Sequence, residues 1–278
     1  MSQPLSKAAA DAAPDAPFVL EETDASGVRT LTLNRPRSRN ALSLGMMDAL
    51  ADTLDRAGSD PAVRIVVVAA EGPAFCAGHD LKELTAARQE ADRGRAFFER
   101  TMTTCAALMT KVVRLPKPVI ARVHALATAA GCQLVASCDL AIAADHAGFC
   151  TPGVNIGLFC STPMVALTRN VPRKQAMEML LTGRVVHAEE ALGLGLVNKV
   201  VAGEALVDET AALAHQIAAK SALTVKIGKE AFYRQAEMDL DGAYRYAAEV
   251  MVENMLARDA EEGIGAFIEK RSPTWEDR

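Results

Sequence analysis

Apolar and polar residues alternate near the start of the chain in a way that predicts strands and a helix in succession. Val19-Leu20 and Val28 to Leu33 flank Ser26-Gly27, which is typical of an antiparallel hairpin with glycine in its turn. Apolar residues then recur at helical spacing from a start near Ser43. The run from Arg64 to Ala70 is rich in β-branched residues, as expected of a strand that is covered on both faces.

A similar pattern follows after a polar stretch. Residues Lys82 to Arg100 are rich in charge and predict a mobile surface helix or loop. Beyond them, Pro118 to Val123 is a predicted strand, Ala129 to Cys138 a buried helix, and Asp139 to Ala144 another short strand. Because strands alternate with helices, we expect parallel pairing, right-handed crossovers and therefore an α/β fold.

The C-terminal part of the chain is predicted to be wholly helical. After an apolar run at 197–201, the periodicity indicates helices at 204–220, 221–235, 239–257 and 260–270. The expected organisation is therefore a mobile tail at 1–17, an α/β core at 18–201 and a helical module at 202–278.

Length and composition allow a large buried core and narrow the choice of partners. The chain has 278 residues, of which 50% are apolar, enough for one large domain or one domain with an appendage. A net charge of -5 and a pI near 5.6 argue against general binding to nucleic acid or to an anionic membrane. Ala147 to Thr168 carry no charge, but prolines and glycines interrupt them, so we expect a buried loop system and no membrane insertion.

The cysteines indicate a reduced, intracellular chain. They form no C-x-x-C pair and no metal-ligand spacing with the five histidines, so no metal site is predicted. The first seventeen residues are rich in alanine and have neither an arginine nor a long apolar run. They resemble neither a secretory signal nor a transit peptide, so we expect a cytoplasmic protein. The six cysteines are Cys76, Cys105, Cys132, Cys138, Cys150 and Cys160.

Two segments are suited to hold a carbonyl oxygen that gains negative charge during a reaction. An enolate forms readily on a thioester when N–H donors point at the carbonyl oxygen, where the charge grows. Phe75 to Leu81 follows a predicted strand and is rich in small residues, so its backbone can approach a ligand closely. Ala129-Ala130-Gly131 opens a predicted helix, where the first amides lack partners and the helix dipole favours negative charge.

Four motifs in the same order resemble those of the crotonase (enoyl-CoA hydratase/isomerase) superfamily. Ala77 to Leu81 matches its A-G-x-D-[LI] motif, and Arg39-Asn40-Ala41-Leu42 matches its [KR]-N-A-[LM] segment. Ala129 to Gln133, followed by Thr151-Pro152-Gly153, resembles its active-site core. The stretch from Glu262 to Arg271 matches its E-G-x-x-A-F-x-E-K-R ending. The chain is most similar to the subgroup called enoyl-CoA hydratase domain-containing proteins, whose animal members are mitochondrial.

The resemblance, which covers roughly 28–271, implies a fold, a ligand and an assembly. The fold would be a spiral of ββα repeats with a C-terminal helical trimerisation module, assembled as a homotrimer or hexamer. The ligand would be an acyl-CoA thioester, with coenzyme A as part of the substrate and no separate cofactor. The backbone amides of His79 and Ala130 would form the oxyanion hole. The residues implied at the CoA thioester are Arg39, Ala41, Ala77, His79, Asp80, Leu81, Lys82, Ala130, Gly131, Pro152, Ser161, Phe267 and Lys270, the last two reaching the CoA of a neighbouring subunit.

Gln133 and Gly153 stand where the hydratases of this superfamily carry glutamates. One carboxylate activates water and the other helps to deliver the proton to the α-carbon, and an amide can do neither. We therefore expect weak or altered hydratase activity. Gln133 is either a polar group that lines the pocket or a buried amide satisfied by the backbone. Gly153 is either a turn glycine after Pro152 or a position that makes room for a bulkier acyl group.

Few other side chains in these motifs offer acid/base chemistry. The sequence shows no activating base for Cys160, and a buried cysteine usually behaves as a small hydrophobic residue. We expect Asp80 to cap or anchor its own loop, His79 to act through its N–H rather than its ring, and His124 to be a hydrogen-bonded core residue. Two functions stay open: an enoyl-CoA hydratase/isomerase-like enzyme of fatty-acid metabolism, or a non-catalytic acyl-CoA-binding or regulatory oligomer.

Overall fold

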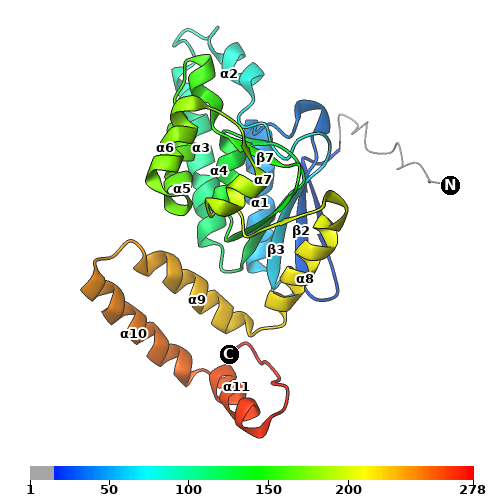
Figure 1. Ribbon diagram of the computed structural model, residues 1–278, viewed down its shortest axis with the longest axis vertical. Coiled ribbons are helices and arrows are strands. Elements are labelled where there is room, and N and C mark those ends of the chain that lie inside the picture. Colours follow the sequence, from blue (N-terminus) through cyan, green and yellow to red (C-terminus); the bar gives the residue numbers. More distant parts are fainter. Residues whose placement is uncertain (1–15) are drawn as a thin grey trace, which may run out of the picture.

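The computed structural model describes residues 16–278, which form a core and a helical extension (Figure 1). The predicted mobile tail, residues 1–17, lies outside the described residues except for its last two. These two are hydrogen-bonded, because the Arg35 guanidinium donates to the carbonyl oxygens of Ala16, at 2.6 Å, and Pro17, at 3.0 Å. The part of the chain that packs on the core therefore includes residues that the sequence assigned to the tail.

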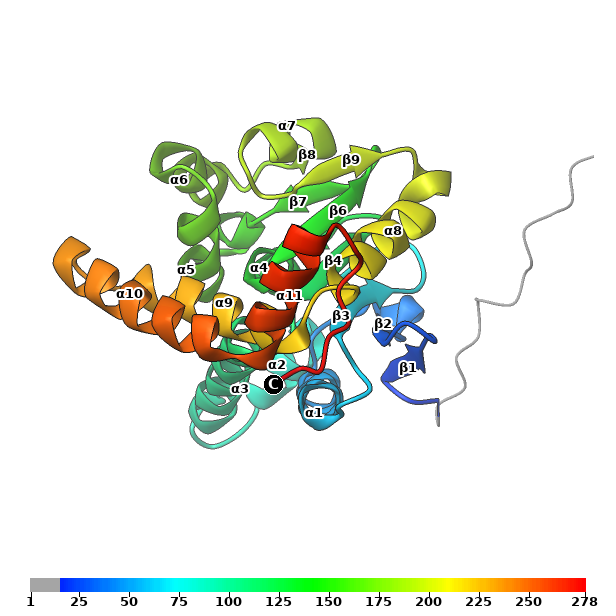
Figure 2. The ribbon, with the colours of Figure 1, turned by 90° about the horizontal axis from the view of Figure 1, so that it is seen from below.

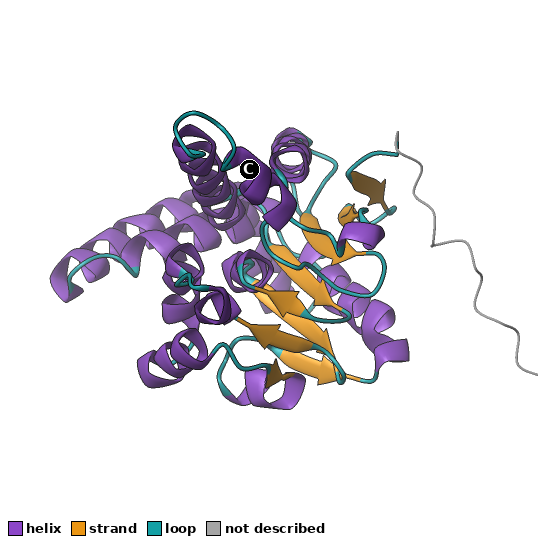
Figure 3. Cartoon of the chain, turned by 90° about the horizontal axis from the view of Figure 1, so that it is seen from above, coloured by secondary structure: helices purple, strands orange, loops and turns teal. Residues whose placement is uncertain are grey.

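A six-stranded sheet forms the centre of the core (Figure 3). The predicted hairpin is confirmed, since β1 (Val19–Thr23) pairs antiparallel with β2 (Val28–Leu33). All further pairs in this sheet are parallel, as the alternation of strands and helices predicted. The strand order is β1-β2-β3-β4-β6-β9, with β3 at Ile65–Ala70, β4 at Val119–Val123, β6 at Leu140–Ala144 and β9 at Lys199–Val201.

A second sheet, with three strands, was not predicted from the sequence. It consists of β5 (Ala127–Thr128), β7 (Gly148–Cys150) and β8 (Val186–His187), in the order β5-β7-β8. These strands are too short for a periodic pattern to reveal them. The second sheet bears on function because β5 runs almost directly into α4 (Ala130–Ser137), so its pairing with β7 helps to fix where α4 begins.

Helices cover the main sheet on both sides (Figure 3). Residues of β3 alternate between the two faces: Val66 and Val68 face the main core, whereas Ile65 and Val67 pack with α8 (Leu206–Ala218). Both faces are apolar, which explains the continuous β-branched run. On the main-core side, the predicted helix after Ser43 is confirmed as α1 (Leu44–Ser59), and the other core helices include α6 (Arg173–Thr182) and α7 (Ala188–Gly193).

The polar stretch from Lys82 to Arg100 forms helices at the surface of the core, as one of the two predicted alternatives had it. It contains α2 (Leu81–Ala87), which is largely exposed, and the first residues of α3 (Arg95–Arg114). Residues 95–100 are exposed or half-buried, so the expectation of a surface segment is confirmed for them. The buried residues of α3 begin at Thr101, and the helix packs against α1 and α4. Charged residues in the first turns of α3 interrupt the apolar periodicity from which the helix could have been predicted. The buried residues of its apolar face include Cys105, Leu108, Met109 and Val112.

The uncharged stretch from Ala147 to Thr168 is only partly buried. It forms β7, a 3₁₀ turn at Pro152–Ile156 and most of α5 (Ser161–Asn170). Ile156 and Val165 are exposed, because the turn and α5 lie at the surface of the core, so the prediction of a buried loop system is wrong there. In the described part of the chain, no helix is long and apolar enough to cross a bilayer.

Three helices project from the core at the C-terminal end (Figures 1 and 2). They are α9 (Ala222–Gln235), α10 (Leu240–Leu256) and α11 (Arg258–Glu269), close to the predicted ranges. Neither α9 nor α10 contains a buried residue. We call the exposed apolar side chains of α9, α10 and α11 the C-terminal apolar surface. They are Phe232, Leu240, Tyr244, Met251, Val252, Met255, Leu256, Ile264, Phe267 and Ile268.

A buried charge joins α9 to the core. The Lys229 side chain is 6% exposed, and its ammonium donates to Asp139 Oδ2 at 2.7 Å. The same ammonium donates to the carbonyl oxygens of Val112, at 3.1 Å, and Lys117, at 3.0 Å. One turn later, the Tyr233 hydroxyl donates to Asp139 Oδ1 at 2.9 Å. These contacts determine where α9 leaves the core.

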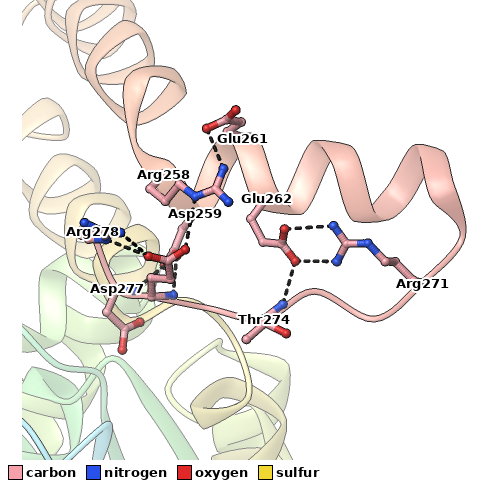
Figure 4. Close-up of polar contacts among 9 residues, drawn as sticks. Arg258, Asp259, Glu261, Glu262, Arg271, Thr274, Asp277 and Arg278 are labelled. Atoms are coloured by element: carbon pink, nitrogen blue, oxygen red, sulfur yellow. Dashed lines mark hydrogen bonds and ion pairs between the residues drawn. The ribbon is translucent and has the colours of Figure 1, made fainter.

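The last residues, 272–278, return along α11 and tie it to the core, and we call them the C-terminal strap (Figure 4). The buried carboxylate of Asp259 accepts hydrogen bonds from the backbone N–H groups of Glu276 and Asp277. Asp277 in turn pairs with Arg64 at 2.7 Å. Arg64 also donates to two carbonyl oxygens at and just beyond the end of α8, so the strap closes on the junction between α8 and α9.

Two further contacts hold the strap. Trp275, the one tryptophan of the chain, donates its indole N–H to the carbonyl oxygen of Ala219 at 2.9 Å. Glu262 pairs with Arg271 through both carboxylate oxygens, at 2.6 and 2.9 Å, and accepts from the Thr274 N–H (Figure 4). The Arg271 guanidinium, together with that N–H, lowers the pKa of Glu262 to about 2.

Candidate active site

Two segments of the core meet beside the first turn of α4. The chain that follows β3 runs past β5, where the Phe75 N–H donates to Leu126 O at 3.0 Å and the Thr128 N–H donates to Cys76 O at 2.8 Å. Gly131 has no space for a side chain, because a Cβ there would collide with the Cys76 carbonyl oxygen. The segment after β3 therefore lies directly against the start of α4.

Ala129 has an unusual backbone conformation at the start of α4. Its φ of 51° and ψ of -114° fall in a region that residues with a Cβ rarely adopt. Its N–H donates to Cys150 O at 2.8 Å, and its carbonyl oxygen accepts from the Gln133 N–H at 3.0 Å. These two hydrogen bonds hold Ala129 and place the next amide, that of Ala130, at the first position of the helix.

The backbone amides of His79 and Ala130 lie in adjoining segments and have no internal partners. Gly78, with a φ of 81°, lies against the start of α4, since a Cβ added to it would be 3.3 Å from Ala130 N. Within residues 16–278, neither amide donates a hydrogen bond to the backbone or to a side chain. Both N–H groups are therefore without an acceptor in the described structure, and the N-terminus of α4 favours a negatively charged one.

Asn40 fixes the loop that lies beside the segment carrying His79. Its side chain is fully buried and donates to the carbonyl oxygens of Glu71, at 2.8 Å, and Ala74, at 3.0 Å. Its Oδ1 accepts the backbone N–H of Arg35 at 2.8 Å. Both polar atoms of this buried amide are thus hydrogen-bonded, which holds the loop in place.

The predicted pocket segment around Arg39 lies next to the segment that carries His79. The Leu42 N–H donates to Gly78 O at 2.7 Å, and the Ala77 N–H donates to Arg39 O at 3.0 Å. The structure thus brings Arg39, Ala41 and Ala77 into adjoining backbone segments. The Arg39 side chain is exposed, so its guanidinium is open to solvent on this side of the core.

Asp80 caps α2, as predicted. Its carboxylate accepts hydrogen bonds from the backbone N–H groups of Lys82, at 2.8 Å, and Glu83, at 3.4 Å. Leu81 and Lys82, in the first turn of α2, are exposed. The Asp80 carboxylate is therefore committed to the helix, while the Lys82 ammonium faces solvent beside the same loop.

Gln133 is buried in α4 and meets a helix that the sequence did not predict. The residue is 4% exposed, and the Cys105 thiol of α3 lies 3.8 Å from its Oε1 as a donor. The side-chain oxygen is thus satisfied by a thiol rather than by the backbone. Because a thiol donates only weakly, this amide keeps capacity for a stronger hydrogen bond.

Gly153 lies in a closely packed turn. A Cβ at this position would be 2.9 Å from Leu158 O and 3.0 Å from Cys160 Sγ. These atoms occupy the space that a side chain would need. The geometry therefore favours a turn glycine after Pro152, which is itself partly exposed, and leaves no room here for a bulkier acyl group.

The Cys132 and Cys160 thiols and the Ser161 hydroxyl offer no reactive nucleophile. Burial raises the pKa of the Cys160 and Cys132 thiols, so both are protonated at neutral pH. Ser161 is exposed, and its hydroxyl donates to Phe159 O at 3.4 Å. Across the described residues, no group of three or more His, Cys, Asp or Glu side chains could hold a metal ion.

The His79 ring is one of two polar side chains in this part of the core with a buried atom that lacks a hydrogen-bond partner in the described structure. Its Nε2 is buried without a hydrogen-bond partner in the described structure, and burial lowers its pKa. The Thr151 hydroxyl is likewise buried and unpartnered. His124 differs, since its Nε2 lies 2.8 Å from Gly72 O, as expected of a hydrogen-bonded histidine. The residue is only half-buried, so the expectation that it belongs to the core is wrong.

Phe267 and Lys270 lie apart from the two amides within one chain. The Phe267 side chain is 84% exposed, and Lys270 ends α11 with a φ of 57°. Figure 1 shows α11 at the opposite end of the molecule from α2. Contact between these residues and the amides of His79 and Ala130 would therefore need a second copy of the chain.

Comparison with known proteins identifies the family to which this fold and site belong. The model of the enoyl-CoA hydratase/isomerase family matches residues 23–278, a span that includes every site residue described above. The chain therefore belongs to the enoyl-CoA hydratase/isomerase family. The predicted crotonase fold with a helical C-terminal region is confirmed, whereas trimerisation through that region stays a prediction.

Similar relatives and structures confirm the predicted subgroup. The Xenopus laevis "Enoyl-CoA hydratase domain-containing protein 3, mitochondrial" is 51% identical over 249 residues, which cover 90% of this chain and 83% of that protein. The crystal structure of the human protein of that name has a TM-score of 0.88 and 46% identity, and covers 93% of this chain and 100% of that one. A crystal structure of an enoyl-CoA hydratase from Mycobacterium smegmatis has a TM-score of 0.89 and 53% identity, over 93% of this chain and 99% of that one.

The predicted cytoplasmic location is wrong. Five vertebrate relatives, between 47% and 51% identical to this chain, are all named mitochondrial. Cysteine usage could not reveal this, because all six cysteines are buried and free, which suits any reducing compartment. The alanine-rich residues on which the expectation also rested lie mostly outside the described part of the chain.

Proposed function

We propose that this chain binds an acyl-CoA or enoyl-CoA thioester and stabilises negative charge on the thioester oxygen. The observation that carries the proposal is the pair of partnerless backbone amides, those of His79 and Ala130, in adjoining segments. Two fixed donors aimed at one oxygen stabilise an oxyanion without reorganisation. Membership of the enoyl-CoA hydratase/isomerase family supports the same class of ligand.

The proposed chemistry is that of an enoyl-CoA hydratase/isomerase-like enzyme of fatty-acid metabolism that passes through a thioester enolate. Coenzyme A would enter as part of the substrate, with no separate cofactor. Gln133 and Gly153 supply no carboxylate, and each missing acid/base group typically lowers a rate by ~10² to 10⁴. We therefore infer that hydration of an enoyl-CoA is weak, although binding of the thioester is retained.

Local cations and a neighbouring copy would complete the CoA site. The chain carries a net charge of -5, so CoA phosphates must be held by nearby cations, and Arg39 and Lys82 are exposed beside the His79 segment. We further propose that the C-terminal apolar surface mediates a homotrimer or hexamer, because apolar patches of this kind are rarely left open in monomers. Such an assembly would bring Phe267 and Lys270 of one copy to the CoA of the next.

A pair of glycine variants tests the proposed oxyanion site. Gly78→Ala would place a Cβ 3.0 Å from Thr128 O and 3.3 Å from Ala130 N, so the two amides must move apart. We expect crotonyl-CoA affinity, measured by titration calorimetry, to fall at least ~10-fold, since small misplacements are costly. Gly157→Ala is the matched control, because its φ of 77° imposes similar backbone strain while no atom lies within 4 Å of the added Cβ. Equal affinities for the two variants would contradict the proposed site.

Direct assay of hydration tests the proposed loss of acid/base groups. Purified protein should bind crotonyl-CoA at micromolar concentrations, yet hydrate it far more slowly than a family member with both glutamates, assayed in parallel. Hydration at a comparable rate would refute the interpretation of Gln133 and Gly153. Failure to bind any acyl-CoA would refute the proposed function itself.

A non-catalytic role in acyl-CoA binding or regulation is the second candidate. It is favoured by Gly153, where the chain fills the space that a catalytic side chain would need. A screen of saturated, unsaturated and carboxylated acyl-CoA thioesters for CoA release, double-bond migration or decarboxylation separates the two. Turnover that is lost in Gly78→Ala but kept in Gly157→Ala would exclude the non-catalytic role.

A further inference from the structure

Glu83 reaches from α2 to the start of α1. Its Oε2 accepts the backbone N–H of Leu44 at 3.2 Å. Leu44 is the first residue of α1, so this N–H has no acceptor within its own helix. Within residues 16–278, no other side chain of α2 hydrogen-bonds to another element. The Glu83 carboxylate is therefore the one polar side-chain link from α2 to the core.

The start of α1 depends on this distant carboxylate for a negative charge. The first turn of α1 contains no acidic residue, although the positive end of the helix dipole favours one. The N-cap of the helix, Ser43, is already engaged, because its hydroxyl accepts the Met46 N–H at 3.1 Å. Glu83 supplies the charge from another helix, 39 residues further along the chain. A contact that a local residue could have made is thus made across the segment that carries His79.

The backbone just before α1 also holds the His79 segment. The Leu42 N–H donates to Gly78 O at 2.7 Å, and Leu42 forms a parallel bridge with His79. The segment from Gly78 into α2 is therefore attached to the start of α1 at two points. One attachment is the backbone next to His79, and the other is the Glu83 carboxylate, about one helical turn later.

Little else holds α2 in place at the end near His79. Its one buried residue, Ala87, lies at the far end of the helix. The contact of the Arg88 guanidinium with the Phe98 ring, at 5.3 Å from the ring centre, lies at the same far end. At the near end, the Asp80 cap joins α2 to the His79 segment. A displacement of α2 would therefore be passed through this cap to the His79 N–H.

We propose that Glu83 is a positioning residue for the oxyanion site, because its carboxylate, held at the start of α1, fixes the direction of the His79 N–H. This inference rests on the proposed function, since it requires a thioester oxygen bound by the His79 and Ala130 amides. The Ala130 N–H belongs to α4 and is placed by the hydrogen bonds of Ala129, so Glu83 acts on only one of the two donors. Stabilisation of an oxyanion requires donors that are fixed before the charge develops.

The carbonyl stretch of bound butyryl-CoA measures this effect without assuming the overall reaction. A hydrogen bond to the carbonyl oxygen weakens the C=O bond and lowers its stretching frequency. The full-length protein is saturated with butyryl-CoA that carries ¹²C or ¹³C at the carbonyl. The infrared spectra of the two complexes are then subtracted, which isolates this stretch from the amide bands. In the unmodified protein, the frequency should lie below that of butyryl-CoA free in buffer.

Three variants separate the contact from the charge and from the surface. Glu83→Ala removes the contact and should keep at most about half of the frequency lowering, because one of the two donors is misaligned. Glu83→Gln keeps an acceptor oxygen without the charge and should lie between Glu83→Ala and the unmodified protein. Glu90→Ala, a change at an exposed glutamate just after α2, should keep the full lowering.

Affinity and stability separate positioning from support of the fold. Glu83→Ala should weaken butyryl-CoA binding by no more than about tenfold, the value of one hydrogen bond. Its urea midpoint should fall by less than about 0.5 M, as expected for the loss of one contact at a helix start. A variant that was only less stable would still show the full frequency lowering at saturation, because every bound molecule would occupy an intact site.

Each outcome decides between the two levels of the proposal. Equal lowering in the unmodified protein and Glu83→Ala would overturn the role of Glu83, and so would an equal reduction in Glu90→Ala. Loss of the folded state in Glu83→Ala, with the full lowering kept in Glu83→Gln, would also overturn it. In these cases the oxyanion site stands. No binding of butyryl-CoA by the unmodified protein, or binding without any lowering, would refute the proposed function and the role of Glu83 with it.

Discussion

Replacing Lys229 by methionine should strongly destabilise the protein, because it removes the charge that joins α9 to the core. The ammonium has three acceptors within hydrogen-bond distance, one of them the Asp139 carboxylate at 2.7 Å. Burial lowers the pKa of Lys229 and Asp139 opposes that shift, as expected of an ion pair removed from water. Methionine has similar length but cannot donate a hydrogen bond to any of the three acceptors.

The magnitude follows from what remains around Asp139. Its carboxylate, 15% exposed, would keep the Tyr233 hydroxyl and the Val119 N–H but lose the opposite charge. Removing one partner of a buried ion pair typically costs about 3 to 5 kcal/mol. Since a typical domain is stable by only about 5 to 15 kcal/mol, this is a large fraction of the total.

Urea unfolding, followed by far-UV circular dichroism, measures this cost. For a slope of about 2 to 3 kcal/mol per molar urea, we expect the midpoint to fall by about 1 to 2.5 M. All variants are compared at one protein concentration, because self-association would shift the midpoint. Lys226→Met, an exposed change on the same helix, should stay within about 0.5 kcal/mol of the unmodified protein.

A double variant tests the reasoning rather than the size alone. If the cost of Lys229→Met arises from an unpaired carboxylate, then Asp139→Asn in the same chain should recover part of it. The expected coupling is about 1 to 3 kcal/mol, the range for residues in direct contact. A loss below about 1 kcal/mol for Lys229→Met, or costs that simply add in the double variant, would refute the account of this ion pair.

Three further predictions concern the site and the strap. Ala129→Gly should raise the free energy of unfolding, measured in urea, by up to about 2 kcal/mol. The change relieves about 1–3 kcal/mol of backbone strain, and the flexibility of glycine in the unfolded chain takes back about 0.5–1 kcal/mol. A less stable variant would show that Ala129 is not strained. Gly153→Ala should lower the stability by about 1 to 3 kcal/mol through contact with Leu158 O, and Gly153→Glu should lower it further without any gain in crotonyl-CoA hydration. The pKa of Glu262 is held at about 2, so the stabilising effect of this carboxylate is complete above the ordinary pKa of about 4.5 and is lost as the pH falls toward 2. The emission of Trp275 should move to longer wavelength across that pH range, and already at neutral pH in Glu262→Gln. Unchanged emission in that variant would count against a role for the pair of Glu262 and Arg271 in the strap.

Much of the fold could be predicted because its signals are local. The hairpin before Leu33 and the buried strand at 64–70 each carry a pattern that one or two faces of a sheet impose. The helix α3 could not be recognised, because the charges around Arg95 and Glu99 precede its buried face and dominate the first turns. The small second sheet was missed for a different reason, since two-residue strands are defined by their partners and not by their own sequence.

The candidate site was only partly visible in the sequence. Motifs located the His79 and Ala130 segments, and the cap formed by Asp80 could be argued from its position before a helix. The partner of Gln133 comes from α3, a helix that was not predicted, so the contact with its thiol could not be foreseen. The unsatisfied ring nitrogen of His79 is a property of three-dimensional burial, which no spacing in the sequence reveals.

The C-terminal strap also has a consequence for the order in which parts of the chain can fold. The backbone N–H of Asp259 donates to the carbonyl oxygen of Arg278, and Asp277 caps the start of α9 through the Ala222 N–H. Residues 272–278 follow the core in the sequence, so they leave the ribosome after it, and the core can fold before they emerge. The three projecting helices can therefore reach their final position only once the strap has been synthesised, later than the core.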